Sequence, residues 1–133
     1  MKKILLLLCF FAISLSVSAQ TVLKLKATAY AYQMQNDYGI WQDWSDWERC
    51  NTPIVMDDNT DRVTIYSPEI QKYDLYDFLG EEVEPDGMTT LTWLFVDQDG
   101  DPGTMRLVSR PSGNVELYID FANIRWAYTV IAD

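Results

Sequence analysis

Histidine is missing from the 133-residue sequence. Imidazole is the usual general base near neutral pH and a common zinc ligand. Its absence therefore excludes histidine-based catalytic triads, histidine general bases and the usual zinc sites. Any catalysis would depend on carboxylates, tyrosine, lysine or serine. No motif points to a cofactor, and we expect neither a cofactor nor a metal ion.

The first residues have the pattern of a cleavable signal peptide. Lys2 and Lys3 form a positive start, and an apolar run follows from Ile4 to Ile13. Val17 and Ala19 match the small-residue pattern that signal peptidase reads, so we predict cleavage after Ala19. We therefore expect an exported protein, located in the periplasm or outside the cell.

Two alternatives to cleavage are an uncleaved N-terminal anchor and a lipid-modified Cys9. The apolar run is about ten residues long, whereas a helix needs roughly 20 to span a bilayer. Cys9 follows Leu6, Leu7 and Leu8 rather than small residues, which disfavours lipid modification. The sequence thus predicts a signal peptide at 1–19 and a single domain at 20–133, with no membrane span after cleavage.

Cysteine is also scarce, because Cys9 would leave with the signal peptide and Cys50 would remain alone. An exported domain with a single cysteine has no internal disulfide. Stability must then come from packing. We expect Cys50 to be a buried, inert thiol, with pairing between chains as the alternative.

Basic residues are few, with 10 Lys and Arg against 20 Asp and Glu. The net charge is −10, and loss of Lys2 and Lys3 would take it to −12. Contacts with phosphate need Lys and Arg, so this domain is poorly suited to bind nucleic acid or an anionic membrane surface. We expect the charge mainly to keep the protein soluble.

Strand patterns dominate the predicted domain, because β-branched and aromatic residues alternate with polar ones between turn-like clusters. We predict eight or nine strands and no helix. The predicted segments are 23–32, 40–49, 54–56, 62–66, 72–78, 89–96, 105–108, 115–121 and 124–130. Asp57–Asp61, Asp97–Gly103 and Pro111–Asn114 are predicted turns, and Gly80–Gly87 is a predicted exposed loop.

Short connections between alternating strands favour antiparallel hairpins in a meander. About eight such strands either close into a barrel or pack as two sheets. We predict an all-β fold and favour an up-and-down barrel, since closure removes exposed edges. A β-sandwich is the alternative.

Three tryptophans at a spacing of three, Trp41, Trp44 and Trp47, are the most unusual feature of the sequence. Asp43 and Asp46 lie between them. Aromatic faces beside hydrogen-bond acceptors can stack a sugar ring or a flat apolar molecule. The alternative is that one tryptophan fills the core and the others cover a barrel end.

Several tyrosines fall on the strand face opposite the more apolar residues. If they cluster, they would form an aromatic patch suited to a protein partner or a glycan. Ordinary cross-strand pairing of aromatic residues is the alternative. These residues are Tyr30, Tyr32, Tyr66, Tyr76 and Tyr118.

Two acidic clusters are candidate binding sites. Asp97, Asp99 and Asp101 alternate as in a calcium loop, but Pro102 stands where the loop needs glycine and Val108 where it needs glutamate. A polar turn explains this cluster better. The acidic residues of Gly80–Gly87 are expected to belong to a solvated loop.

Four segments of the predicted domain together carry a resemblance. They are Trp41–Glu48, Ile65–Ser67, Asp97–Gly100 and Leu117–Phe121. In these segments the chain resembles a set of short exported proteins of Gram-negative bacteria. The resemblance implies an exported location and an all-β fold, and it implies no catalytic activity.

The sequence therefore predicts an exported, non-enzymatic binding module for a small apolar or sugar-like ligand. The predicted ligand-binding residues are Trp41, Trp44, Trp47, Tyr30 and Tyr32. A protein-interaction or structural envelope domain that acts through the tyrosine-rich face is the first alternative. A carboxylate-based hydrolase is the second, because two acids across a cleft can hydrolyse glycosides.

Overall fold

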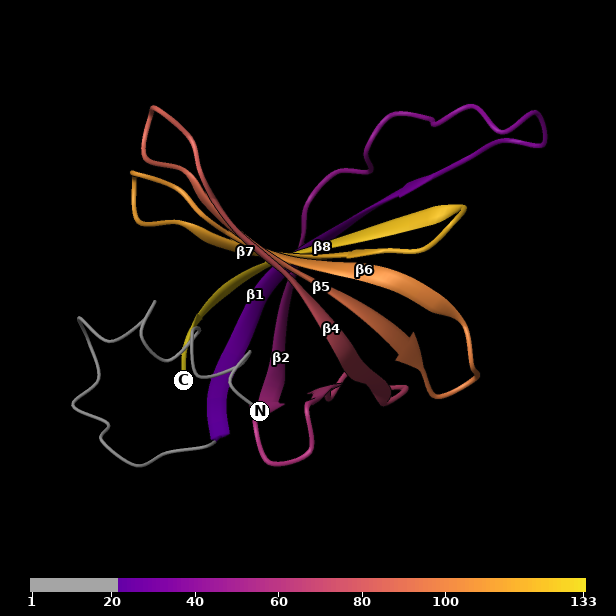
Figure 1. The fold of residues 1–133 in the computed structure, drawn as a ribbon. Helices are drawn as coiled ribbons and strands as arrows, with labels where there is room; N and C mark the ends of the chain where they lie inside the picture. The colour runs from indigo at the N-terminus through magenta and orange to yellow at the C-terminus, as the bar shows by residue number, and fades with distance from the viewer. Residues whose placement is uncertain (1–21) are drawn as a thin grey trace.

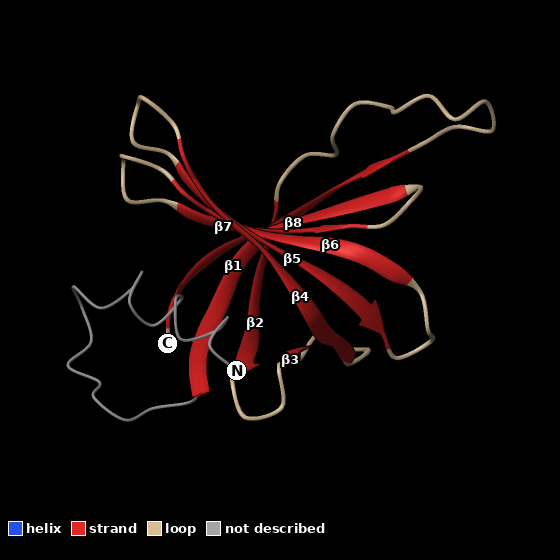
Figure 2. Ribbon diagram, viewed as in Figure 1, coloured by secondary structure: helices blue, strands red, loops and turns tan. Residues whose placement is uncertain are grey.

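The computed structural model describes residues 22–133, which form eight strands and no helix (Figure 2). The predicted signal peptide lies outside the described residues. Within residues 22–133, no helix is long and apolar enough to cross a membrane. The strands are β1 (Val22–Met34), β2 (Glu48–Asp57), β3 (Arg62–Ile65), β4 (Gln71–Val83), β5 (Thr89–Asp97), β6 (Pro102–Ser109), β7 (Val115–Asp120) and β8 (Ile124–Ala132).

The strands close into an antiparallel barrel in sequence order, as predicted. Each strand pairs with the next, and β8 pairs back with β1. The favoured up-and-down barrel is thus confirmed over the β-sandwich. In Figure 1 the long β1–β2 connection and the β5–β6 and β7–β8 turns lie on one side of the crossing strands, and the β4–β5 and β6–β7 turns lie on the other.

Alternating residues of the strands fill the barrel interior. Leu91, Trp93 and Phe95 of β5 are completely buried, as are Leu117 and Ile119 of β7. Strict alternation puts each of these side chains on the inner face and leaves the residues between them outside. Burial of this continuous apolar core is the main source of stability.

A β-bulge at Thr28 reverses the alternation of β1. Ala27 pairs with Val130 of β8, but the next pair joins Ala29 to Thr129, so Thr28 is an extra residue. Such an insertion exchanges the inner and outer positions that follow it.

The bulge corrects the sequence prediction for Tyr30 and Tyr32. Tyr30 pairs with Tyr128, which is 5% exposed and belongs to the core, and Tyr32 pairs with Trp126. Directly paired residues share a face, so both tyrosines lie on the inner face. The prediction that they oppose the apolar face is wrong, because it assumed unbroken alternation from Leu23.

The predicted strand at Ile40–Arg49 is also wrong for most of its length. Asn36 Oδ1 accepts hydrogen bonds from the backbone N–H groups of Tyr38 and Ile40, at 2.9 and 3.0 Å, and Gly39 adopts a φ of +76°. These hydrogen bonds from the Asn36 side chain fold the segment into a turn. The turn also needs glycine at position 39, because glycine adopts a positive φ readily. We call the segment Gln35–Trp47 the tryptophan loop.

The predicted loop at Gly80–Gly87 begins four residues later than expected. β4 continues to Val83, which pairs with Thr89 of β5. The ladder between β4 and β5 contains two register shifts. After them it continues through the polar residues Glu81 and Glu82.

The shortest strand in the barrel wall is β3. This strand contributes four residues, and they pair with Ile54–Asp57 of β2 and Gln71–Asp74 of β4. The first half of β2, from Glu48 to Pro53, has only β1 as a paired neighbour. One end of the barrel is therefore open beside β2.

Candidate functional site

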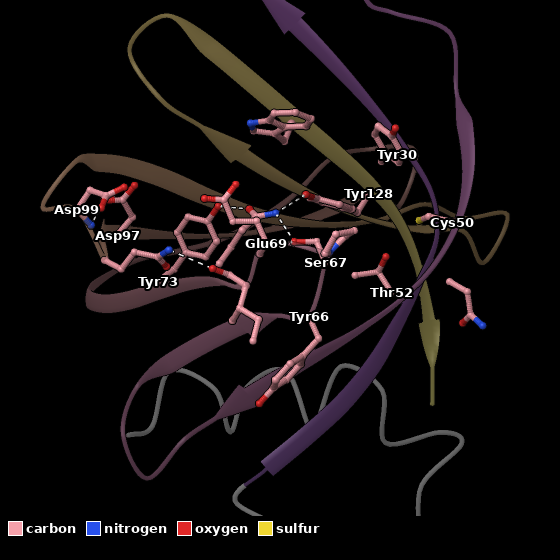
Figure 3. Close-up of a pocket in the computed structure, with 16 residues that line it drawn as sticks. Tyr30, Cys50, Thr52, Tyr66, Ser67, Glu69, Tyr73, Asp97, Asp99 and Tyr128 are labelled. Atoms are coloured by element: carbon pink, nitrogen blue, oxygen red, sulfur yellow. Dashed lines mark hydrogen bonds between the residues drawn. The ribbon is translucent and has the colours of Figure 1, made fainter.

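A cavity of about 880 Å³ occupies this end of the barrel. Its walls come from β2 at Cys50–Thr52, from the β3–β4 connection at Tyr66–Ile70, and from the β5–β6 turn at Asp97–Asp99. In Figure 3, Asp97 and Asp99 lie at one end of the cavity, and Cys50 and Thr52 lie towards the other.

Aromatic side chains form much of the cavity wall. The bulge at Thr28 brings Tyr30 inside, where its ring centroid lies 6.5 Å from that of Trp126. The ring of Tyr73 is anchored edge-on against Phe95, with 4.9 Å between ring centroids. The aromatic residues that line the cavity are Tyr30, Tyr66, Tyr73, Trp126 and Tyr128.

A hydrogen-bond network centred on Gln71 holds two of these tyrosines. Gln71 Nε2 donates to Ser67 Oγ at 3.0 Å and to Tyr128 Oη at 3.3 Å, while Tyr73 Oη donates to Gln71 Oε1 (Figure 3). Burial raises the pKa of both the Tyr73 and the Tyr128 hydroxyl above the ordinary value for tyrosine. Both hydroxyls are thus neutral near pH 7, and the amide of Gln71 is fully engaged.

All charged residues that line the cavity are acidic. They are Glu69, Asp97 and Asp99, and no lysine or arginine is among the lining residues. A further carboxylate lies beside the wall, where Tyr30 Oη donates a hydrogen bond to Glu48. That bond raises the pKa of Tyr30.

The carboxylates of Asp97, Asp99 and Asp101 come within 4.8 Å of one another. Asp97 Oδ1 accepts hydrogen bonds from the N–H groups of Asp99 and Asp101, at 2.9 and 2.8 Å. These bonds are those of an Asx-stabilised turn. The arrangement agrees with the prediction of a polar turn, and we assign no metal ligands to it.

The three tryptophans of the tryptophan loop are not among the residues that line the cavity. Trp41 packs against Arg125, whose Cζ is 4.0 Å from the ring centroid. Trp44 meets Tyr118 edge-on, at 6.1 Å between ring centroids, and Trp47 is 49% exposed. Arg125 and Tyr118 point outward, so Trp41 and Trp44 lie on the outside of the barrel.

Of the five predicted ligand-binding residues, Tyr30 lines the cavity. Tyr32 is at its rim, with its ring 5.6 Å from that of Trp126, and is 40% exposed. The structure thus brings Tyr30 and Tyr32 together and places Trp41, Trp44 and Trp47 elsewhere. Whether the tryptophans contact a ligand stays a prediction.

The tyrosine-rich face is divided between several places. Tyr30 and Tyr66 line the cavity, whereas Tyr118 is outside the barrel against Trp44. Tyr76 lies at a register shift in β4 and is 55% exposed. Reversed alternation in β1 explains why Tyr30 is on the inner face while Tyr118 is outside.

Sequence reasoning missed Gln71, Tyr73, Trp126 and Tyr128 as cavity residues. A signal for three of them was present, because Tyr73 alternates with polar neighbours and Trp126 and Tyr128 share the face of Val130. Such positions predict inward side chains. What the pattern could not show is that these rings stop short of filling the barrel end.

Cys50 and Ser67, two possible nucleophiles on the cavity wall, donate their hydrogen bonds to backbone carbonyls and not to a base. Cys50 Sγ donates to the carbonyl of Ala27 at 3.5 Å, and Ser67 Oγ donates to the carbonyl of Glu69. Activation of such groups needs a base within hydrogen-bonding reach.

Comparison with models of known protein families, with curated proteins and with solved structures gave no match for this chain. The resemblance to short exported proteins of Gram-negative bacteria therefore stays a prediction.

Proposed function

We propose that this protein is an exported, non-enzymatic binding module that holds a small ligand in the cavity at the open end of its barrel. The observation that carries the proposal is a cavity of about 880 Å³ with five aromatic residues in its wall. Natural ligand sites are concave, largely apolar and furnished with a few fixed polar groups. Small barrels commonly use their open ends in this way.

The rigidity of the cavity wall supports the proposal. Tyr73 and Tyr128 are 3% and 5% exposed, and both are tied to Gln71. A wall that is ordered before binding loses little conformational entropy when a ligand arrives. The rings are therefore ready to stack an apolar molecule or a sugar.

A matched pair of tyrosine substitutions tests the proposal. Tyr66 and Tyr76 are 48% and 55% exposed, but only Tyr66 lines the cavity. We expect Tyr66→Ala to weaken binding of the neutral fluorescent probe N-phenyl-1-naphthylamine about fivefold or more, whereas Tyr76→Ala leaves it unchanged. Fluorescence titration measures both affinities, and neutral mono- and disaccharides serve as competitors.

Trp47→Ala is the second comparison, because Trp47 belongs to the tryptophan loop and is 49% exposed. If this variant loses the probe while Tyr66→Ala keeps it, the ligand site is the tryptophan loop and not the cavity. If neither the probe nor any saccharide binds the wild-type protein, the binding function itself is rejected.

A protein-interaction domain is the second candidate function, favoured by the apolar side chains that the tryptophan loop exposes. Tyr38 is 88% exposed and Ile40 is 60% exposed. Exposed apolar groups in one segment are typical of contact surfaces. A strictly monomeric protein that captures no partner from envelope extracts would count against this candidate.

A further inference from the structure

We propose that the ligand of the barrel-end cavity is a small organic ammonium ion. This inference rests on the proposed binding function and adds the chemical class of the ligand. It combines three features of the cavity: its charge, its aromatic faces and the hydrogen-bonding state of its polar groups.

The cavity carries negative charge without compensation from its own wall. Glu69, Asp97 and Asp99 are the charged residues among those that line it. Glu69 and Asp99 are exposed and Asp97 is half-buried, so their fields add at the mouth of the cavity, where solvent screens them in part. A cation entering the cavity is attracted, and an anion is repelled.

None of the lysine and arginine residues in 22–133 is among the residues that line the cavity. Arg62 pairs with Asp74, and Arg110 pairs with Glu116, each at 2.8 Å or less. Arg125 lies over the ring of Trp41 on the outside of the barrel. Lys72, the basic residue next to Gln71, pairs with Thr64 on the outer face of its strand.

The aromatic wall favours a cation for a separate reason. The face of an aromatic ring is the negative part of its quadrupole, so it attracts an ammonium group within about 6 Å. The ring centroids of Tyr30 and Trp126 lie 6.5 Å apart, with 47° between the ring planes. The two rings therefore line the same cavity at different inclinations. Tyr66 adds a third ring from the β3–β4 connection.

Several hydrogen-bond donors of the cavity wall are already engaged with one another, whereas its three carboxylates can only accept. Both N–H groups of Gln71 are engaged with Ser67 and Tyr128, and the Tyr73 hydroxyl donates to Gln71. Carboxylates accept hydrogen bonds and donate none. A sugar presents hydroxyls that need both donors and acceptors, whereas an ammonium ion needs acceptors or negative ring faces alone.

The test compares choline with its neutral carbon analogue, 3,3-dimethylbutan-1-ol, which has the same shape without the charge. We expect the wild-type protein to bind choline at least about fivefold more tightly than the analogue. Calorimetry or NMR titration measures both affinities. Salt at about 0.5 M should weaken choline binding and leave the analogue unaffected.

Substitution of single carboxylates separates the effect of charge from that of shape. We expect Glu69→Gln and Asp99→Asn each to weaken choline binding about two- to fivefold, with no change for the neutral analogue. Glu84→Gln is the matched control, because Glu84 is an exposed acid in the β4–β5 turn at the opposite end of the barrel. Asp97 is left intact because it holds the β5–β6 turn.

Equal affinity for choline and the neutral analogue would overturn the ammonium inference and leave the proposed binding function standing. Tighter binding of a neutral saccharide than of choline would do the same and would identify a sugar site. Loss of choline affinity in Glu84→Gln equal to that in Glu69→Gln would also overturn it, because the effect would then come from net charge alone.

Discussion

Gly103 shows how closely a single residue can be constrained in this barrel. It pairs with Phe95, so its α-carbon faces the interior. A Cβ atom built there would lie 2.4 Å from Phe95 Cζ and 2.6 Å from the carbonyl oxygen of Asp120. No side chain fits at this position without displacement of the ring and of the β7 backbone.

We therefore expect Gly103→Ala to lower the free energy of unfolding by about 1–3 kcal/mol, as measured by urea denaturation. The double variant Gly103→Ala/Phe95→Leu should be less destabilised than the sum of its single variants, because the shorter side chain removes part of the clash. Wild-type stability in Gly103→Ala would contradict the close approach of these groups.

The spacing of the tryptophans in the sequence does not identify the tryptophan that lines the cavity. Spacing of three drew attention to Trp41, Trp44 and Trp47, yet the tryptophan that lines the cavity is Trp126. Trp126 belongs to an ordinary alternating strand, which gives no signal of a binding residue. The bulge in β1 places Tyr30 beside Trp126, with 6.5 Å between the two ring centroids.

At the scale of the element, β3 is the weakest part of the barrel wall. It forms four pairs with each neighbour, whereas β4 and β5 share nine. Short ladders open locally at lower free energy than long ones. An opening of β3 would widen the cavity, because Tyr66 and Ser67 follow directly after this strand.

We expect the amide protons of Val63 and Ile65 to exchange at least about tenfold faster than those of Leu91 and Leu107 in native-state hydrogen exchange. All four side chains are completely buried, so the comparison isolates the effect of ladder length. Equal protection at the four sites would show that β3 opens only when the whole barrel unfolds.

The strands themselves were largely predictable from the sequence. Alternation located the cores of β5, β7 and β8, and Asp and Asn located the turn between β2 and β3. The failures have two physical causes. The bulge at Thr28 depends on pairing with β8, which lies about a hundred residues away, and the tryptophan loop depends on capping by Asn36. Neither the bulge nor the turn at Asn36 changes the alternation of apolar and polar residues from which a strand is predicted.

The sequence has no histidine. The pH dependence of the stability of the whole molecule at alkaline pH therefore depends on its buried tyrosines. Burial raises the pKa of Tyr73, Tyr118 and Tyr128 above the value of about 10 that tyrosine has in an unfolded chain. The unfolded state then releases these protons first as the pH rises. The stability that depends on the neutral hydroxyls is fully present below pH 10 and is lost above it.

We therefore expect the urea midpoint to fall steeply above about pH 10. Tyr73→Phe should reduce this dependence by up to about 1.4 kcal/mol per pH unit, the contribution of one proton. Tyr38→Phe is the control, because its side chain is 88% exposed and outside the core. An unchanged pH dependence in Tyr73→Phe would exclude the buried hydroxyl as a cause.

The ladder between β1 and β8 determines when the fold can be completed during synthesis. Leu25 pairs with Ala132, so the first strand lacks one neighbour until the eighth has emerged from the ribosome. A growing chain can add strands to the meander, but it keeps two unpaired edges throughout. Such non-local closure is slow, and unpaired edges are templates for aggregation. A nascent chain of this protein would therefore benefit from a chaperone until β8 is in place.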